Sequence, residues 1–148
     1  MSNVDQNLSE ALKALLANSY ILFLKTQNYH WNVTGPMFAP LHALFEEQYN
    51  DLFEANDEIA ERLRAIGELA PGSYEAFQPY SKVAEETEHP KAMDMVSNLA
   101  TDHKTLAGLA QALIDAGTAA NDDVSVDLGV RRKEVHDKTH WMLSSHLE

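Results

Sequence analysis

Imidazole and carboxylate side chains occur along one stretch of the sequence at spacings that could build a metal site. They are His42, Glu46, Asp57 and Glu61. On a helix, where each residue turns by about 100°, these positions span roughly 100° and therefore share one side. His30 precedes them, and a helical hairpin would bring its imidazole beside that of His42. Nitrogen and carboxylate ligands suit iron, manganese or zinc, and acidic ligands would stabilise Fe(III) as the metal is oxidised.

The spacing along this helix argues against a metal site closed by one chain. Asp57 lies about 22 Å beyond His42 at 1.5 Å per residue, whereas metal–ligand bonds are near 2 Å. If a second copy packs antiparallel across a two-fold axis, its Asp57 and Glu61 face the first copy's His30 and His42. The predicted helix interiors also lack the Glu-x-x-His pairs that ferritin-type sites within one bundle use. We therefore expect an obligate oligomer with shared metal sites.

The same residues allow a purely structural interpretation. Carboxylates four residues apart, such as Asp57 and Glu61, are common on exposed helices and could form a solvated face near two arginines. His30 and His42 could be histidines whose hydrogen bonds are satisfied in the core. The protein would then be a scaffold or interaction module, and it would show no saturable oxidation of Fe(II).

Sparse glycine and proline divide the chain into four long predicted helices and one short one. The long helices are expected at residues 4–33, 38–66, 90–116 and 122–143, and the short helix at 74–80. We expect Asn3 to cap the first helix, Asn121 to cap the fourth, and Gly117 to end the third. In the second helix the apolar residues form one narrow core stripe, made of Leu41, Phe45, Leu52, Ile59 and Leu63. Two helical hairpins joined by a long connection predict an all-α, ferritin-like four-helix bundle, with one domain over residues 1–148.

The composition favours metal ions over nucleic acid as partners. With 23 acidic and 11 basic residues, the net charge of -12 makes the average surface attract cations and repel phosphate backbones. Because the chain has no cysteine, disulfides, thiolate zinc sites and cysteine nucleophiles are excluded. The N-terminal residues do not have the pattern of a signal peptide, so we expect a soluble, cytoplasmic protein.

Three segments together resemble the signature of the Dps family, the mini-ferritins named as DNA-binding proteins from starved cells. They are Asn28-Tyr29-His30-Trp31-Asn32-Val33-x-Gly35-Pro36-x-Phe38, Leu41-His42-x-x-Phe45-Glu46, and Asp57-Glu58-Ile59-Ala60-Glu61-Arg62. The resemblance covers the whole four-helix layout. It implies a dodecameric shell that oxidises Fe(II), preferably with hydrogen peroxide, and stores ferric mineral inside, thereby protecting the cell from oxidative stress.

The resemblance also assigns roles to individual residues. It implies a two-iron ferroxidase site at the two-fold subunit interface, built from His30 and His42 of one subunit and Asp57 and Glu61 of its partner. Glu46 occupies a further acidic position where some family members carry Asp. Trp31 would lie beside the site as an electron donor or radical quencher, although a large aromatic could equally fill a subunit interface.

A further acidic segment resembles the lining of the pores through which iron enters the family's shells. It reads Asn121-Asp122-Asp123-x-x-x-Asp127. Aspartates at a helix start also serve as caps and favour the helix dipole, which explains Asp122 and Asp123 without a pore. Asp127 is the stronger pore candidate because capping does not require it.

Binding to DNA, as a nucleoid-associated and DNA-protecting protein, is the alternative function. DNA binding in the Dps family often relies on a lysine-rich terminal arm, but the first twelve residues here contain no Lys or Arg. The basic cluster Arg131-Arg132-Lys133 lies inside a predicted helix, where such clusters usually form a solvated face. We expect weak or absent DNA binding. His136 and His140, spaced i and i+4, could form a second metal site with His103, although acidic ligands are lacking there.

Overall fold

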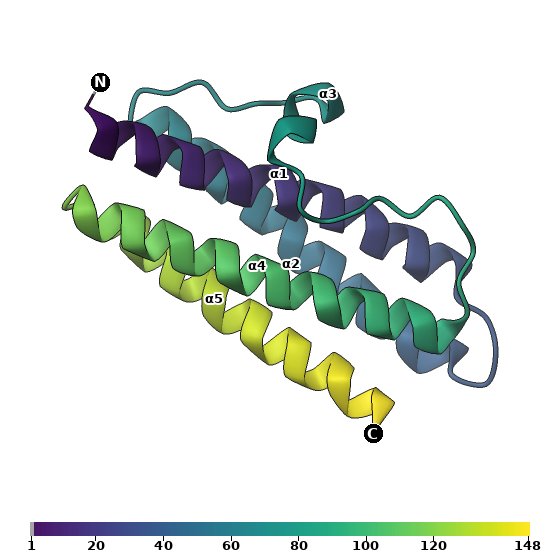
Figure 1. The fold of residues 1–148 in the computed structure, drawn as a ribbon. Coiled ribbons are helices and arrows are strands. Elements are labelled where there is room, and N and C mark those ends of the chain that lie inside the picture. Colours follow the sequence, from purple (N-terminus) through teal and green to yellow (C-terminus); the bar gives the residue numbers. More distant parts are fainter. Residues whose placement is uncertain (1) are drawn as a thin grey trace.

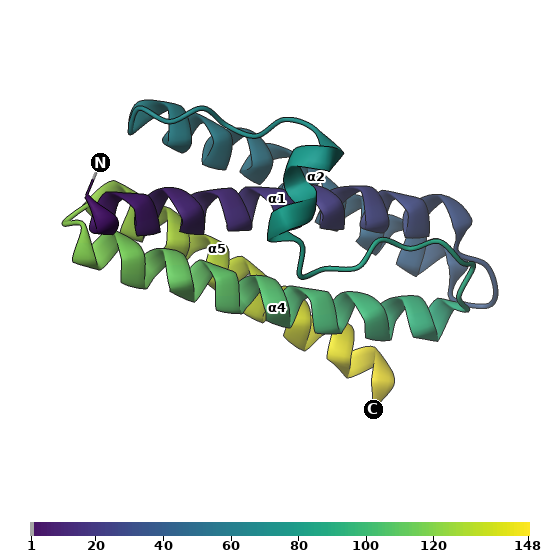
Figure 2. The same ribbon diagram turned by 45° about the horizontal axis from the view of Figure 1, so that its top comes forward.

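Four long helices, arranged as two antiparallel hairpins, build the structure, a computed structural model that describes residues 2–148 (Figure 1). They are α1 (Asn3–Asn32), α2 (Phe38–Ala65), α4 (Ala92–Ala119) and α5 (Asp123–Ser144). A long connection between the hairpins carries α3 (Tyr74–Phe77) and the 3-10 turn η1 (Gln78–Tyr80), and a second 3-10 turn, η2 (Ser145–Leu147), follows α5. The connection runs along the length of α1, so α2 and α4 point the same way (Figures 1 and 2). The predicted all-α four-helix bundle is confirmed.

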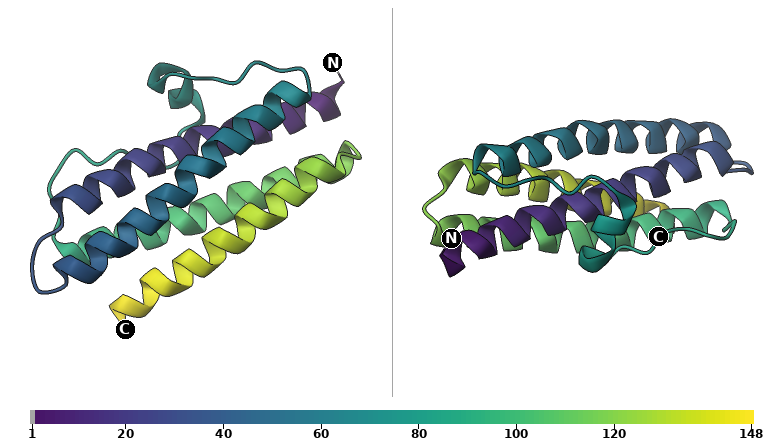
Figure 3. Two further views of the ribbon diagram at one scale, coloured as in Figure 1. Left: turned by 180° about the vertical axis from the view of Figure 1, so that it is seen from behind. Right: turned by 90° about the horizontal axis from the view of Figure 1, so that it is seen from above.

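The core of the bundle is built mainly from leucine. All five residues of the predicted α2 stripe are fully buried: Leu41, Phe45, Leu52, Ile59 and Leu63. Burying one such side chain stabilises the fold by about 1.5–3 kcal/mol, so this stripe alone favours the docked position of α2. Helix α1 packs against α2 on one side and α4 on another. Few backbone positions of α2 and α5 come close to each other, and both helices are seen from behind in Figure 3.

A buried asparagine fastens the long connection to α1. Asn18 is fully buried, and its Oδ1 accepts hydrogen bonds from the amides of Lys82, at 2.7 Å, and Val83, at 3.0 Å. Its Nδ2 donates to the carbonyl oxygens of Tyr80, at 2.9 Å, and Ala14, at 2.8 Å. One side chain therefore satisfies backbone groups that the irregular connection could not pair by itself.

A second set of polar contacts joins α1, α4 and the connection. Lys25 Nζ lies 2.8 Å from Asp102 Oδ2 and donates to the Ala84 carbonyl oxygen at 2.9 Å. The Tyr29 hydroxyl donates to Glu86 at 2.5 Å, and burial together with this bond raises the pKa of Tyr29. Removing one partner of such a buried network leaves the other unsatisfied, so these contacts fix the path of the chain between α2 and α4.

The caps of two helices differ from those expected. Ser2, not Asn3, caps α1, because its extended backbone lets the hydroxyl accept from the Asp5 amide at 3.1 Å. Asp122, not Asn121, caps α5, and Asn121 instead adopts a left-handed conformation with φ of 54° in the turn between α4 and α5. Asparagine tolerates this region better than most residues, so the turn takes Asn121 and leaves the capping role to its neighbour.

The third long helix is shifted from its predicted limits. It begins at Ala92, rather than at Pro90, and it continues through Gly117 to Ala119. Gly117 does not end the helix because it serves packing: a Cβ atom there would lie 3.0 Å from a methyl group of Val126 on α5. This glycine lets α4 and α5 approach closely near their shared turn.

Candidate metal centre

His30 and His42 lie side by side, as the predicted hairpin requires. His30 is near the end of α1 and His42 is near the start of α2, and their rings stack with centroids 3.7 Å apart and planes inclined by 13°. His30 Nδ1 donates to the His42 carbonyl oxygen at 2.6 Å, and His42 Nδ1 donates to the His30 carbonyl oxygen at 2.7 Å. Because a carbonyl only accepts, each Nδ1 carries a proton, and the neutral form of either ring has its lone pair on Nε2. This tautomer can bind a metal through Nε2.

Neighbouring aromatic rings hold the histidine pair in place. Phe38 stacks on His42 with centroids 5.0 Å apart, and Tyr49 meets His30 edge-on at 5.2 Å. His30 is only 7% exposed, while His42 is half-buried. Packing and hydrogen bonds together restrict the rotamers of both imidazoles, so the pair is prepared for binding.

Asp57 and Glu61 form a pair of exposed carboxylates further along α2. A hydrogen bond and the like charge from Asp57 raise the pKa of Glu61, which shows that the two groups lie close together. Neither has a cation within ion-pair distance in the part of the chain that the structure describes. The nearby arginines point elsewhere: Arg62 binds Asp122 at 2.8 Å, and Arg64 donates to a backbone carbonyl. The carboxylate pair is therefore not neutralised by the arginines beside it in the sequence.

The two groups of candidate ligands are not brought together within one chain. Residues 2–148 contain no group of three or more His, Asp or Glu side chains that could hold a metal ion. Glu46, one helical turn after His42, is exposed. Trp31, which follows His30, is 60% exposed, an unusual position for so large an apolar ring. A metal bound by both groups would need a second copy of the chain.

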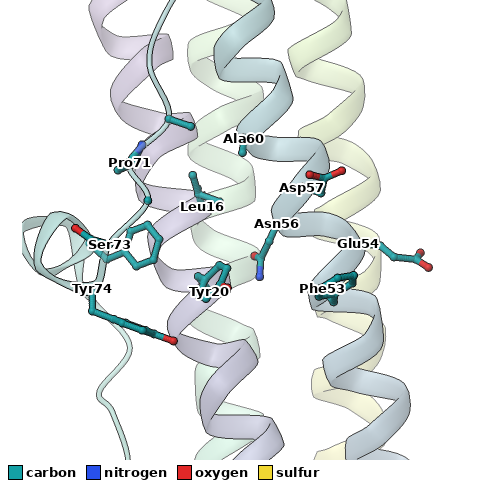
Figure 4. Close-up of a pocket in the computed structure, with 13 residues that line it drawn as sticks. Leu16, Tyr20, Phe53, Glu54, Asn56, Asp57, Ala60, Pro71, Ser73 and Tyr74 are labelled. Atoms are coloured by element: carbon teal, nitrogen blue, oxygen red, sulfur yellow. The ribbon is translucent and has the colours of Figure 1, made fainter.

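An open apolar hollow borders the carboxylate pair (Figure 4). It has a volume of about 770 Å³ and lies between α1, α2 and the long connection. Tyr20, Phe53, Asp57 and Tyr74 are among the side chains around it, and Phe53 is 64% exposed. An exposed apolar surface of this kind is typical of a contact with another protein.

The acidic residues at the start of α5 make more internal contacts than predicted. Asp122 caps the helix and binds Arg62; burial would raise the pKa of Asp122, but hydrogen bonds from Arg62 and Ser125 outweigh it and lower the pKa. Asp127 accepts a hydrogen bond from Arg131 at 2.9 Å, one helical turn away. Asp123 is exposed in the first turn. Of the three predicted pore residues, Asp122 has the clearest structural role.

A buried histidine pair lies where α4 meets α5, and its two members are 33 residues apart in the sequence. His103 Nδ1 and His136 Nδ1 are 2.9 Å apart, and Arg132 Nη2 lies 3.3 Å from His136 Nε2. Arg132 donates two hydrogen bonds to Asp51 on α2, at 3.0 and 2.9 Å. Burial, with smaller contributions from Arg132 and His140, lowers the pKa of His103 to about 3.

The second metal site suggested by His136 and His140 is not formed among the described residues. His140 Nδ1 instead donates to the Ala100 carbonyl oxygen at 2.7 Å. The positively charged Arg132 beside His136 would repel a cation. The spacing of Arg132 and His136, four residues apart, was the only local signal for this network, and no spacing could have pointed to Asp51.

The basic cluster of α5 is occupied by contacts within the bundle. Arg131 binds Glu58, Arg132 binds Asp51, and Lys133 Nζ donates to Gln111 at 2.8 Å. These contacts leave little of the cluster to bind phosphate groups. Among residues 2–148, no helix combines the length and hydropathy needed to cross a membrane.

Comparison with known proteins places this geometry in a family. The model of the ferritin-like domain family matches residues 9–148. The chain is 31% identical to a DNA protection during starvation protein from Brevibacillus brevis, over 99% of both chains. It is also 39% identical over 145 residues to a low temperature-induced protein from Nostoc sp., covering 97% of this chain and 81% of the relative.

Solved structures agree with these relatives. A Dps protein from Bacillus brevis superposes with a TM-score of 0.96 at 31% identity, covering 100% of this chain and 99% of that one. Dps from Staphylococcus aureus gives a TM-score of 0.93 at 34% identity, with 97% and 96% covered. Dps from Vibrio cholerae, described as a member of the ferritin-like diiron-carboxylate superfamily, gives 0.93 at 28% identity, with 98% and 91% covered. The fold is therefore the ferritin-like bundle that the sequence predicts, and the chain belongs to the Dps family.

Proposed function

We propose that this protein oxidises Fe(II) and stores the ferric product inside a hollow shell of identical subunits, which protects the cell from oxidative damage. The observation that carries the proposal is the presence of two separate half-sites on one chain. His30 and His42 offer two available Nε2 atoms, and Asp57 and Glu61 offer two carboxylates that form no ion pair within residues 2–148. Two copies packed antiparallel across a two-fold axis would complete two identical sites. The ferritin-like family and its diiron-carboxylate relative support iron as the metal.

Each half-site has its own task in the proposed reaction. His30 and His42 bind Fe(II) through Nε2, while the partner's Asp57 and the partner's Glu61 bind from the opposite side. Negative oxygen ligands favour Fe(III) over Fe(II), because they stabilise the higher charge. Glu46 is exposed one turn after His42, and we assign it as an additional acidic group for the second iron.

We propose hydrogen peroxide as the preferred oxidant, on the strength of the family resemblance. Peroxide takes up two electrons and two protons to give two water molecules, and two Fe(II) supply both electrons. Oxidation of iron in pairs avoids the hydroxyl radical that a one-electron reduction of peroxide releases. The reaction therefore removes Fe(II) and peroxide together, the two substances from which hydroxyl radical forms.

The shell itself is proposed to be a dodecamer in the cytoplasm. The open hollow beside Asp57 provides an apolar surface for the two-fold contact, and the exposed Trp31 and Phe38 near the histidine pair provide rings that could fill it. Asp123 and Asp127 are proposed to line the pores through which Fe(II) enters. Asp122 would contribute less there, since it is half-buried and paired with Arg62, whereas Asp127 stays exposed although Arg131 pairs with it.

Anaerobic titration with Fe(II), followed by addition of peroxide, tests the proposed site. Wild-type protein should oxidise a saturable number of Fe(II) ions per subunit, and Asp57→Ala/Glu61→Ala should lose this saturable phase. Glu47→Ala/Asp137→Ala removes two exposed acidic groups outside the proposed site and serves as the matched control. An unchanged oxidation stoichiometry in Asp57→Ala/Glu61→Ala would refute the site.

Protection of DNA by direct binding is the second candidate function. It is favoured by the name of the Brevibacillus brevis relative, a DNA protection during starvation protein. Against it stand the net charge of -12 and the ion pairs of the basic cluster on α5. We therefore propose that any protection of DNA comes from removal of iron and peroxide.

A further inference from the structure

A continuous row of aromatic rings leads from the histidine pair to the apolar hollow. Tyr49 lies 5.2 Å from His30 between ring centroids, Phe23 lies 6.0 Å from Tyr49, and Tyr20 lies 5.6 Å from Phe23. Tyr74, on the connection, lies 6.0 Å from Tyr20. We name Tyr49, Phe23, Tyr20 and Tyr74 the aromatic row. All of its steps are ordinary contacts between edge-on rings.

One end of the aromatic row touches the histidine half-site, and the other end lines the hollow that the carboxylate half-site borders. Tyr49 touches His30, while Tyr20 and Tyr74 line the hollow that Asp57 borders (Figure 4). If the iron sites are shared as proposed above, His30 and Asp57 of one chain belong to different sites of the same two-fold pair. The row then runs from one iron site to the other, and this inference rests on that proposed function.

The residue types of the row suit the transfer of single electrons. A tyrosine can give up one electron together with its phenolic proton, whereas phenylalanine can only bridge between two donors. Tyr49 and Tyr20 are half-buried, so their protons can pass to solvent, and Phe23 contacts both rings. Packing α1 against α2 would require rings here, but it would not require hydroxyl groups on two of them.

We propose that Tyr49 and Tyr20, bridged by Phe23, carry one oxidising equivalent between the two iron sites of a two-fold pair. A site that holds a single Fe(II) supplies one of the two electrons that peroxide needs. Tyr49 supplies the second electron and releases its proton; with one further proton from solvent, peroxide becomes two water molecules and Tyr49 becomes a neutral radical.

The radical is then passed along the row and removed at the second site. Tyr20 reduces the Tyr49 radical by giving up an electron and a proton, and becomes a radical itself. Fe(II) at the second site reduces Tyr20 back to the phenol, which takes a proton from solvent, and the iron becomes Fe(III). Two half-filled sites thereby share one peroxide without release of hydroxyl radical.

Tyr49→Phe and Tyr20→Phe test the inference, since both keep the ring and remove the redox-active hydroxyl. The protein is loaded anaerobically with one Fe(II) per site and mixed with one peroxide per two Fe(II). Rapid-freeze EPR detects tyrosyl radical, and a spin trap detects hydroxyl radical. Tyr80→Phe, which changes a tyrosine outside the aromatic row, is the matched control.

Wild type and Tyr80→Phe should show a transient tyrosyl signal and little spin adduct. Tyr49→Phe should give a several-fold larger spin adduct and lose the tyrosyl signal. Tyr20→Phe should keep the small spin adduct but show a several-fold longer-lived tyrosyl signal, because the Tyr49 radical can no longer pass to the second site. Spin adduct and tyrosyl signal equal to wild type in both variants would overturn the inference, as would a signal that disappears only in Trp31→Phe.

The outcome for the row can be separated from the outcome for the iron site. If wild type oxidises Fe(II) saturably and Asp57→Ala/Glu61→Ala does not, the shared site stands, and unchanged row variants refute only the electron path. If wild type shows no saturable oxidation, or if Asp57→Ala/Glu61→Ala behaves like wild type, the shared site fails and the electron path fails with it.

Discussion

At the scale of single residues, hydrogen bonds to the backbone prepare His30 and His42 for a metal ion. Each imidazole donates its Nδ1 proton to the carbonyl of the other residue, so two peptide groups act as the supports that metal-binding histidines normally need. The two rings also stack on each other, with centroids 3.7 Å apart, and this contact restricts both imidazoles further.

His42→Ala is expected to weaken Fe(II) binding, because it removes one proposed ligand. It also removes the hydrogen bond from His42 to the His30 carbonyl oxygen, which joins the end of α1 to the start of α2. Removing a residue that only hydrogen-bonds to a metal ligand typically lowers affinity about 10- to 100-fold, so removing a ligand should cost no less than this. Anaerobic calorimetric titration with Fe(II) measures the change. His89→Ala, which alters an exposed histidine in the connection, should bind like wild type. Equal affinity in His42→Ala would exclude this imidazole as a ligand.

At the scale of helices, two ion pairs join α5 to α2. Arg132 reaches Asp51 and Arg131 reaches Glu58, although few backbone positions of these two helices come close to each other. Behind Arg132, the buried His103 and His136 stay neutral, since burial lowers the pKa of both. The α4–α5 hairpin therefore carries a buried polar network that reaches Asp51 on α2.

This network predicts that stability falls on mild acidification. In the unfolded chain His103 takes up a proton below its ordinary pKa of 6.5, whereas in the folded chain it does so only near about 3. The unfolded state therefore binds more protons between these values, and stability is lost as the pH falls from 6.5 toward 3. Each such histidine contributes a slope of about 1.4 kcal/mol per pH unit. Burial lowers the pKa of His136 as well, so it acts in the same direction.

Thermal unfolding at fixed protein concentration, between pH 7.5 and 4.5, checks this expectation. His103→Leu/His136→Leu should show a clearly shallower loss of midpoint temperature below pH 6.5 than wild type. His146→Leu removes an exposed histidine and should keep the wild-type slope. Parallel curves for wild type and His103→Leu/His136→Leu would show that acid sensitivity arises elsewhere.

At the scale of the whole molecule, the chain exposes the surfaces that an assembly would bury. Trp31 and Phe53 are exposed to 60% and 64%, and the hollow beside Phe53 is open and largely apolar. Both lie on the same hairpin, α1 with α2: Trp31 is beside the turn that joins the two helices, and Phe53 is near the middle of α2. An antiparallel pair of such hairpins would place the rings of one copy against the hollow of the other.

Phe53→Asp is expected to weaken the two-fold contact, since it puts a charge into the apolar hollow next to Asp57. Size-exclusion chromatography with light scattering should show a smaller species than in wild type, together with reduced saturable Fe(II) oxidation. Thr101→Asp adds the same charge at an exposed position of α4 and should assemble normally. A wild-type mass for Phe53→Asp would place the contact on another surface.

The charge of the whole molecule also predicts how it interacts with DNA. The net charge is -12, and the basic cluster Arg131-Arg132-Lys133 is engaged by Glu58, Asp51 and Gln111. Gel-shift experiments at low salt and neutral pH should therefore show weak or no binding, because the attraction of basic groups for phosphate is the main source of non-specific affinity. A tight complex at low salt would contradict this prediction.

Much of the fold follows from local sequence patterns. The positions of the four long helices, the α2 core stripe and the meeting of His30 with His42 all depend on helical periodicity and on breaks at glycine and proline. These patterns involve residues within one or two turns of a helix. They can therefore be recognised in the sequence without knowledge of the contacts between distant residues.

Other features were decided only by the tertiary structure. Gly117 remains inside α4 because Val126 packs against it, Arg131 and Arg132 of the basic cluster pair with acids of α2, and His103 meets His136 from another helix. The aromatic row likewise joins rings from α1, α2 and the connection. The sequence by itself determined which helices form and which faces they bury. The helix packing alone decided which side chains meet across them, because those contacts join residues far apart in the chain whose spacing no local pattern records.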